Sequence, residues 1–281
     1  MITVLMPLKN YHQVFLKKAV ESLFWQTSPE WNLIIIVEQS DLRKFSKILD
    51  KELEDHRIKI IVNEGRKLSG AFNTGMRYSS SEFVAILLAD DMWAPETVET
   101  LHRYISQNLN IDFFHSSRLI VDENDEVISK VYKSRKDFTI NDFKFGAPVK
   151  HLLCWRREKA LSFGGLDETL NSVGPDDYDF PWTMAENGAS FMAIEECLYY
   201  YRHHLKAFRL TTHLPLSIHK KEIERILLKH GVEREIIDKR IIEGEETYLQ
   251  QCIYNNRFEK FFKQIFGSSK PLVNIYEKKN P

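Results

Sequence analysis

The chain has 281 residues, of which 43% are hydrophobic and 28% are charged. This length and composition indicate a hydrophobic core in one large domain, or in one domain with an extension, and exclude a mainly disordered chain. Lysine and arginine number 39 and aspartate and glutamate number 40, which gives a formal charge of −1. Without a global positive field, we expect no nucleic-acid partner.

The three cysteines are far apart in the chain and odd in number. This spacing fits neither a disulfide framework nor paired zinc ligands. The N-terminal segment carries no basic leader, and no stretch reaches the ~18 consecutive apolar residues of a membrane-spanning helix. We therefore expect a cytoplasmic location, with peripheral contact at the inner face of the membrane as the alternative.

Four short apolar runs rich in β-branched residues predict strands at Ile2–Met6, Leu33–Val37, Ile58–Val62 and Phe83–Leu88. The runs are continuous rather than alternating, which is typical of strands covered on both faces by helices. Helical periodicity over residues 14–26 and 41–54 places a helix in each of the first two gaps. This alternation predicts a parallel, doubly wound α/β sheet, whose ligands lie beyond the carboxyl ends of the strands.

The rest of the chain is less regular. Pro95 opens another predicted helix, and residues 110–205 show a mixed pattern with a turn at 122–125. From about residue 215 the chain becomes charged and helical, with predicted helices at Lys220–His230, Glu233–Glu246 and Tyr248–Phe266.

Two adjacent carboxylates, Asp90 and Asp91, follow the fourth predicted strand. Neighbouring strand residues point to opposite faces, so we expect only one of the pair to hold a metal unless the chain turns there. We assign Asp91 to a divalent cation, manganese or magnesium, and Asp90 to a ribose hydroxyl or to a supporting contact. The alternative is a solvated loop or a cap for the helix that begins at Pro95.

A second acidic cluster contains Asp176, Asp177 and Asp179. Mutual repulsion raises the proton affinity of at least one carboxylate, which suits a general base that acts on an alcohol. The alternative is that these side chains cap a helix over residues 178–187.

A third cluster, Arg202 and His203, follows three tyrosines. A neutral imidazole can join carboxylates on manganese, so His203 is a candidate metal ligand, and Arg202 can face phosphate. A structural or exposed histidine is the alternative.

The order of these motifs resembles that of inverting nucleotide-sugar glycosyltransferases of the GT-A fold, in the broad family two. The matching segments are Ile2–Asn10, Leu33–Glu38, Asn63–Gly65 with Gly70–Gly75, Phe83–Asp91, Gly164–Glu168, and Asp176–Asp179 leading to Tyr199–Arg202. The resemblance implies a GT-A-like, Rossmann-related, mostly parallel sheet flanked by helices over residues 1–205. Residues 1–110 would form the nucleotide-binding half and 111–205 the acceptor-binding half, followed by a helical extension over 206–281.

The resemblance also implies a site. The residues that it places on the nucleotide sugar are Pro7, Leu8, Lys9, Glu38, Arg66, Asn73 and Asp90. It maps the metal diphosphate onto Asp90 and Asp91 and the catalytic base onto Asp177, with Asp176 second. Residues 141–158, which include His151 and Trp155, would border the acceptor pocket. Trp155 is then a sugar platform, or alternatively a core tryptophan.

The implied function is metal-dependent transfer of a sugar, with inversion, from a nucleoside-diphosphate sugar to a hydroxyl of a glycan or a lipid-linked acceptor. A UDP-sugar is the donor that the resemblance favours. Three positions depart from the family pattern: Gln39 and Leu88 stand where aspartate is common, and Phe72 stands where arginine is common. A catalytically inactive GT-A-fold glycan-binding or scaffold protein is therefore the alternative.

The C-terminal extension lies outside the resemblance. Its aromatic residues Phe258, Phe261, Phe262 and Phe266 alternate with Lys260 and Lys263. This pattern fits an amphipathic helix at a membrane that carries a lipid-linked acceptor. It also fits packing on the catalytic domain, or against a second subunit in a homodimer.

Overall fold

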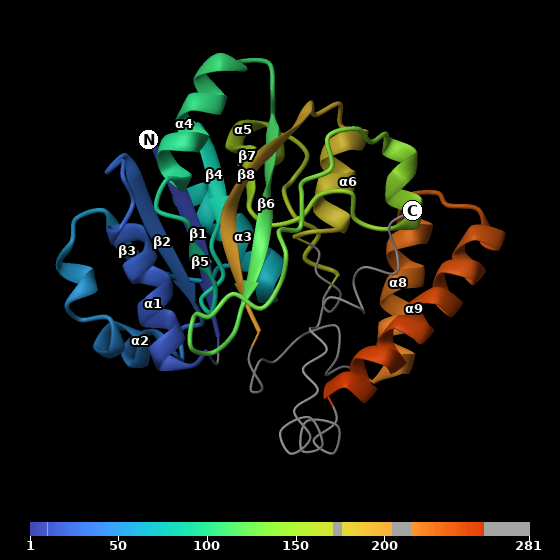
Figure 1. The fold of residues 1–281 in the computed structure, drawn as a ribbon, viewed down its shortest axis with the longest axis horizontal. Helices are drawn as coiled ribbons and strands as arrows, with labels where there is room; N and C mark the ends of the chain where they lie inside the picture. The colour runs from blue at the N-terminus through green and yellow to red at the C-terminus, as the bar shows by residue number, and fades with distance from the viewer. Residues whose placement is uncertain (10, 171–175, 204–214, 256–281) are drawn as a thin grey trace.

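The computed structural model describes residues 1–9, 11–170, 176–203 and 215–255, with side chains described up to residue 246. Within these residues, eight strands form one sheet in the order β3-β2-β1-β4-β7-β6-β8-β5, with helices on both faces (Figure 1). The mixed α/β fold expected from the sequence is confirmed, and its helical extension follows the sheet.

The N-terminal half of the sheet is parallel. It contains β1 (Ile2–Leu8), β2 (Trp31–Val37), β3 (Ile58–Val62) and β4 (Phe83–Ile86). β1 lies between β2 and β4, and β2 also pairs with β3. Every residue of β1 is buried, because helices cover both of its faces. This explains why the sequence shows continuous apolar runs.

The helices divide between the two faces. α1 (Gln13–Phe24), α2 (Leu42–Ile48), η1 (Glu52–Glu54) and α4 (Thr97–Gln107) belong to the core on one face. α3 (Lys67–Tyr78), α5 (Arg157–Leu161) and α6 (Asp179–Glu186) belong to the core on the other. The helix predicted over residues 41–54 is shorter than expected, because α2 ends at Ile48 and a turn precedes η1.

The remaining strands are β5 (Met92–Trp93), β6 (Phe113–Val121), β7 (Leu153–Arg156) and β8 (Phe191–Arg202), and η2 (Ile140–Phe145) connects β6 to β7. β7 runs antiparallel between β4 and β6, whereas β6 and β8 are parallel. The predicted turn after β6 is present, with Asp125 at φ 72°. β8 ends beside the turn that follows β4, which brings the third sequence cluster to the first.

The described part of the C-terminal extension contains α8 (Leu216–Lys229) and α9 (Arg234–Asn255). Figure 1 shows both helices beside α6, at the opposite end of the view from β3 and α2. Ile226, Leu227 and Ile237 are fully buried in a third core cluster with residues of η2 and α6. The predicted break between Glu246 and Tyr248 is absent, since α9 continues through it. The aromatic run from Phe258 to Phe266 lies outside the described residues.

None of the helices in the described residues is both long enough and apolar enough to cross a membrane.

Candidate active site

An open groove of about 670 Å³ lies beyond the carboxyl ends of β1, β2 and β3. The residues that line it are Lys9, Glu38, Ser40, Asp41, Gly65, Arg66, Lys67, Glu168 and Thr169. Three of the residues expected to contact a nucleotide sugar, Lys9, Glu38 and Arg66, therefore share one surface. The groove combines cations with carboxylates, which are the groups that can contact a phosphate and a ribose hydroxyl.

The loop at Gly164–Glu168 closes one side of the groove and is fastened to α3. The Asn73 side chain donates to the carbonyl of Leu166 at 2.9 Å and accepts from its N–H at 2.8 Å. Glu168 accepts from the Asn73 amide at 3.0 Å and from the Arg66 N–H at 2.8 Å. Asn73 is 4% exposed, so its amide positions the loop, while Glu168 and Arg66 form the groove wall.

Lys67 is the first residue of α3 and has φ 55°, an uncommon backbone conformation for a residue with a side chain. Strained residues of this kind are concentrated at ligand-binding sites, where the surrounding structure stabilises them. The carbonyl of Lys67 accepts from the Asn63 side chain, which also donates to Glu38 at 3.2 Å. Lys67 thus adds a second cation beside Arg66 on the groove wall.

The chain turns at the first acidic cluster, as the Asp91 N–H donates to the Leu88 carbonyl at 3.1 Å. The Asp91 carboxylate is 1% exposed and accepts from the Tyr199 hydroxyl and from the Arg202 N–H, both at 2.7 Å. Burial and then the charge of Asp90 raise the pKa of Asp91 to about 7, against the effect of these hydrogen bonds. The turn therefore concentrates negative charge in a buried position.

Arg202 supports this turn rather than facing a ligand. Its side chain is fully buried, donates to the Asp90 carbonyl and the Asp122 carbonyl at 2.8 Å, and forms an ion pair with Asp125 at 2.5 Å. The guanidinium therefore fixes the backbone of Asp90 against the turn after β6. The expectation that Arg202 faces phosphate is wrong, because all of these contacts are to the protein itself.

In the second acidic cluster, Asp176 is 4% exposed and bonds to His151 Nε2 at 3.1 Å. Burial lowers the pKa of His151, but this hydrogen bond and the charges of Asp176 and Asp177 outweigh it and raise the pKa. The two carboxylates therefore favour the protonated, positively charged form of His151.

Asp177 is partly buried, and within the described ranges its carboxylate makes no hydrogen bond or ion pair. Burial and then the charge of Asp176 raise the pKa of Asp177 to about 6, while the positive charges of His151, Arg118 and Lys150 lower it. A carboxylate that lacks protein partners and titrates near neutrality has the properties of a general base. The sequence did not single out Arg118, which lies far from Asp177 and outside any motif, or Lys150, although Lys150 lies in the segment 141–158 expected at the acceptor pocket.

Tyr199 and His151 link the two acidic clusters. Their ring centroids are 5.4 Å apart, Tyr199 bonds to Asp91, and His151 bonds to Asp176. Burial and the charges of Asp90, Asp91 and Asp176 together raise the pKa of Tyr11 well above its usual range. The two clusters, more than eighty residues apart in the sequence, therefore meet at one place beside the segment that follows β1.

Three residues expected at the site, Trp155, Pro7 and Leu8, have buried side chains instead. Trp155 is fully buried, stacks on Phe113 and donates to the Met76 sulfur, so the prediction of an acceptor platform is wrong and the core alternative is correct. The Pro7 and Leu8 side chains are buried in β1, which leaves only their backbone for a ligand.

His203 follows directly after Arg202 at the end of β8, and its N–H donates to the Val121 carbonyl at 2.7 Å. Its place in the chain is one residue from the N–H that binds Asp91, but its role as a metal ligand stays a prediction.

The donor set at Asp91 fits a hard divalent cation. Each carboxylate oxygen has two acceptor positions, and the hydrogen bonds from Tyr199 and Arg202 use one on each oxygen. Across the described residues, no three His, Cys, Asp or Glu side chains converge on a common metal position. A cation here would therefore be held by Asp91 together with oxygens of a substrate, as is usual for magnesium.

The mixed sheet with helices on both faces is a GT-A-like fold, and comparison with solved structures agrees. The structure of S. aureus TarS residues 1–349 in complex with UDP matches 86% of this chain and 70% of that chain, with a TM-score of 0.62 and 15% identity. The complex of the same protein with UDP-GlcNAc gives a TM-score of 0.63 and covers 92% of this chain and 74% of that chain, at 14% identity.

The chain belongs to glycosyl transferase family 2, whose model matches residues 3–155. Among its relatives, an uncharacterized glycosyltransferase of Methanocaldococcus jannaschii is 29% identical over 206 residues, 72% of this chain and 70% of that protein. The UDP-Glc:alpha-D-GlcNAc-diphosphoundecaprenol beta-1,3-glucosyltransferase WfgD of Escherichia coli is 29% identical over 195 residues, 69% of each chain.

Proposed function

We propose that this glycosyltransferase moves a sugar from a nucleoside-diphosphate sugar to an acceptor hydroxyl, in one displacement that inverts the anomeric carbon. The observation that supports the proposal is the link from Asp91 through Tyr199 and His151 to Asp176. It joins a buried acidic turn that suits a metal diphosphate to the turn that carries Asp177, a carboxylate without a hydrogen-bond or ion-pair partner among the described residues, which suits a base.

Asp177 is the proposed base. It removes the proton of the acceptor hydroxyl while that oxygen attacks the anomeric carbon, and the bond from this carbon to the diphosphate breaks on the opposite side. His151 and Asp176 hold the turn that carries Asp177, and the charges of His151, Arg118 and Lys150 favour the ionised base.

On the donor side, Lys9, Glu38, Arg66 and Lys67 line the groove that would accept the nucleotide. Asp91 would hold the cation, with Asp90 beside it and His203 as a second candidate ligand. A bound manganese or magnesium ion would supply positive charge that stabilises the departing nucleoside diphosphate.

A UDP-sugar is the proposed donor, and a glycan or lipid-linked acceptor is the proposed acceptor. Two relationships support this choice. The TarS structures contain UDP and UDP-GlcNAc, and the name of the relative WfgD specifies a UDP-Glc donor and a diphosphoundecaprenol-linked acceptor.

The direct test is nucleotide release from a panel of nucleoside-diphosphate sugars with manganese, using the full chain and the variants Asp177→Asn and Asp91→Ala. We expect each variant to lose at least about a hundredfold in turnover, since general bases typically contribute 10²–10⁴-fold. Asp137→Asn is the matched control, because Asp137 is exposed and far from both clusters in sequence.

Unchanged turnover in Asp177→Asn would contradict its role as the base. A wild-type chain that binds UDP without releasing it from any donor would instead support the inactive glycan-binding alternative.

A further inference from the structure

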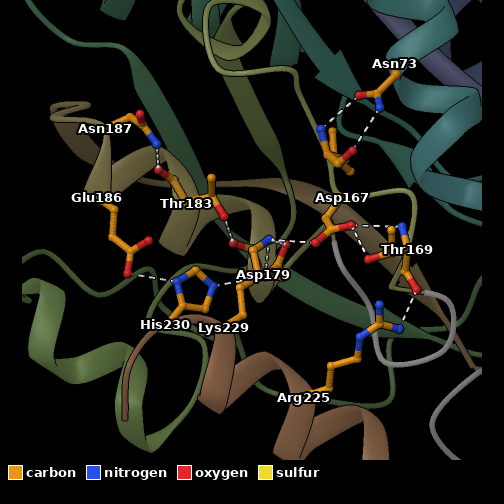
Figure 2. Close-up of polar contacts among 11 residues, drawn as sticks. Asn73, Asp167, Thr169, Asp179, Thr183, Glu186, Asn187, Arg225, Lys229 and His230 are labelled. Atoms are coloured by element: carbon orange, nitrogen blue, oxygen red, sulfur yellow. Dashed lines mark hydrogen bonds and ion pairs between the residues drawn. The ribbon is translucent and has the colours of Figure 1, made fainter.

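The C-terminal helix α8 reaches the active-site loops through the side chain of Lys229. The ammonium group lies 2.9 and 2.8 Å from the two carboxylate oxygens of Asp179, and 3.2 Å from Asp167 (Figure 2). Asp179 begins α6, two residues after the proposed base Asp177. Asp167 precedes Glu168, which lines the nucleotide groove. One ammonium group therefore joins the turn that carries the base to the loop that lines the groove.

The neighbouring His230 strengthens the contact with α6. Its Nε2 lies 2.9 Å from Asp179 and its Nδ1 lies 2.8 Å from Glu186, while its ring stacks on Trp182 at a centroid distance of 4.0 Å. The His230 side chain is fully buried. The end of α8 is therefore packed against α6 directly beside Lys229.

A second contact reaches the same groove loop. Arg225 donates to the Thr169 carbonyl at 2.8 Å, and Thr169 is itself a groove residue (Figure 2). The Thr169 N–H and hydroxyl both donate to Asp167, at 2.8 and 2.6 Å. Arg225 and Lys229, one helical turn apart on α8, therefore hold two ends of one short loop segment.

We propose that Lys229 and Arg225 are positioning residues for sugar transfer, and that α8 thereby completes the active site by fixing the groove loop relative to the base-bearing turn. This inference rests on the proposed function for its kinetic consequences. It assigns to the C-terminal extension a role in donor binding that lies outside the part of the chain matched by the family model, residues 3–155.

The electrostatics explain why Lys229 would matter more than an ordinary surface lysine. Asp179 is 1% exposed, and Lys229 contacts both of its oxygens whereas His230 contacts one. Loss of the ammonium group would leave this buried carboxylate with His230 alone among the described residues, which is destabilising. Without the ammonium group, Asp167 and Asp179 would repel each other across the gap that Lys229 fills. The loop and the turn would then move apart, while the helices remain joined through the apolar core around Trp182.

The first experiment measures backbone hydrogen exchange in the ligand-free full-length chain. In Lys229→Met we expect faster exchange over residues 164–170 and 176–179, with the rest of the sheet unchanged. Lys229→Arg should restore slow exchange, since arginine keeps the charge and the reach. The matched control is Lys220→Met on the same helix, because Lys220 pairs with Glu245 of α9 and contacts neither loop.

The second experiment measures steady-state transfer, which separates the two contacts. Arg225→Gln should raise KM for the sugar nucleotide and leave kcat nearly unchanged, since among the described residues Arg225 bonds to the groove loop and not to the turn that carries Asp177. Lys229→Met should raise KM and also lower kcat, for a combined loss of roughly ten- to a hundredfold in kcat/KM, the scale of a small misplacement of reacting groups.

The outcomes are distinct. Unchanged exchange in both segments of Lys229→Met, or faster exchange spread evenly over the whole chain, would overturn the positioning role. An active Lys229→Met enzyme with wild-type KM and kcat would also overturn it. If the wild-type chain transfers no sugar, the proposed function fails, while the exchange experiment still decides whether α8 fixes the two loops.

Discussion

At the scale of single residues, the candidate site contains two carboxylates whose surroundings differ. Asp91 has both oxygens hydrogen-bonded and is buried beside Asp90, whereas Asp177 makes no hydrogen bond or ion pair within the described ranges and lies near three cationic groups. The first arrangement suits a carboxylate held in place to bind a cation, whose positive charge would favour its ionised form. The second suits a group that gains and loses a proton during turnover.

The pKa of Asp177 gives a pH dependence. Because the base must be deprotonated, kcat/KM should be half-maximal near pH 6 and rise above it. In Lys150→Met this limb should move to higher pH, since a positive charge that favours the ionised carboxylate is removed. The exposed Lys133→Met is the control. A pH profile that is flat from 5 to 8, or the same in both variants, would rule out Asp177 as the titrating base.

The pKa of Asp91 gives a stability prediction. Its folded-state pKa, about 7, is above the unfolded value of 3.8. Between these two pH values the folded protein binds more protons than the unfolded chain. The free energy of unfolding therefore falls as pH rises through this range, by about 1.4 kcal/mol per pH unit. Asp91→Asn removes this penalty. In thermal unfolding with a chelator, we expect the Tm of Asp91→Asn relative to that of the wild type to be higher at pH 8 than at pH 5.

The same variant tests the cation. Manganese should raise the Tm of the wild type, because a ligand of the folded state stabilises it, and should leave the Tm of Asp91→Asn unchanged. Equal shifts in both proteins would place the cation elsewhere.

At the scale of elements, α3 shows how close packing constrains the sequence. A Cβ on Gly70 would lie 2.4 Å from the backbone carbon of Gly65, and one on Gly75 would lie 2.8 Å from Leu5. These glycines let α3 approach the groove loop and the sheet, although glycine weakens a helix interior. Because of these glycines, helix propensity alone does not predict α3.

Gly70→Ala should therefore destabilise the chain by about 1–3 kcal/mol, the usual cost of overpacking, and should also weaken UDP binding, because Gly65 and Glu168 lie next to the added methyl. The control is Gly244→Ala in α9, where nothing lies within 4 Å of the new Cβ. That change should be neutral or stabilising by up to about 1 kcal/mol. Urea unfolding and calorimetry with UDP measure both effects.

At the scale of the whole molecule, three hydrophobic clusters join the sheet, its two helical layers and the C-terminal helices. The third cluster contains Phe143 from η2, Trp182 from α6 and Ile237 from α9. Because this cluster crosses from the sheet domain to the extension, we expect the two parts to unfold together.

Ile237→Ala tests this expectation. Ile237 is fully buried, so the change should cost about 2–5 kcal/mol and lower the midpoint of a single urea transition seen by both tryptophan fluorescence and far-UV circular dichroism. Ile242→Ala on the same helix is the control, since Ile242 is 60% exposed. Two separate transitions in Ile237→Ala would show that the extension unfolds independently.

Local patterns in the sequence determined a large part of the fold. The four parallel strands were predictable because burial on both faces requires continuous apolar runs, and the bounds of Ile58–Val62 agree residue for residue with β3. The acidic turns were also predictable, because polar groups must follow buried strands where the chain returns to solvent. Both signals depend on residues close together in the chain.

Tertiary structure alone decided which of these residues meet. The pairing of β5 with β8 brings Tyr199 to Asp91, and the connection before β7 brings His151 to Asp176. It also decided that Trp155 lies in the core and that Lys229 reaches both active-site loops. These contacts join residues that are far apart in the chain. Local sequence patterns do not predict them, because the packing of the sheet and the helices determines which distant residues meet.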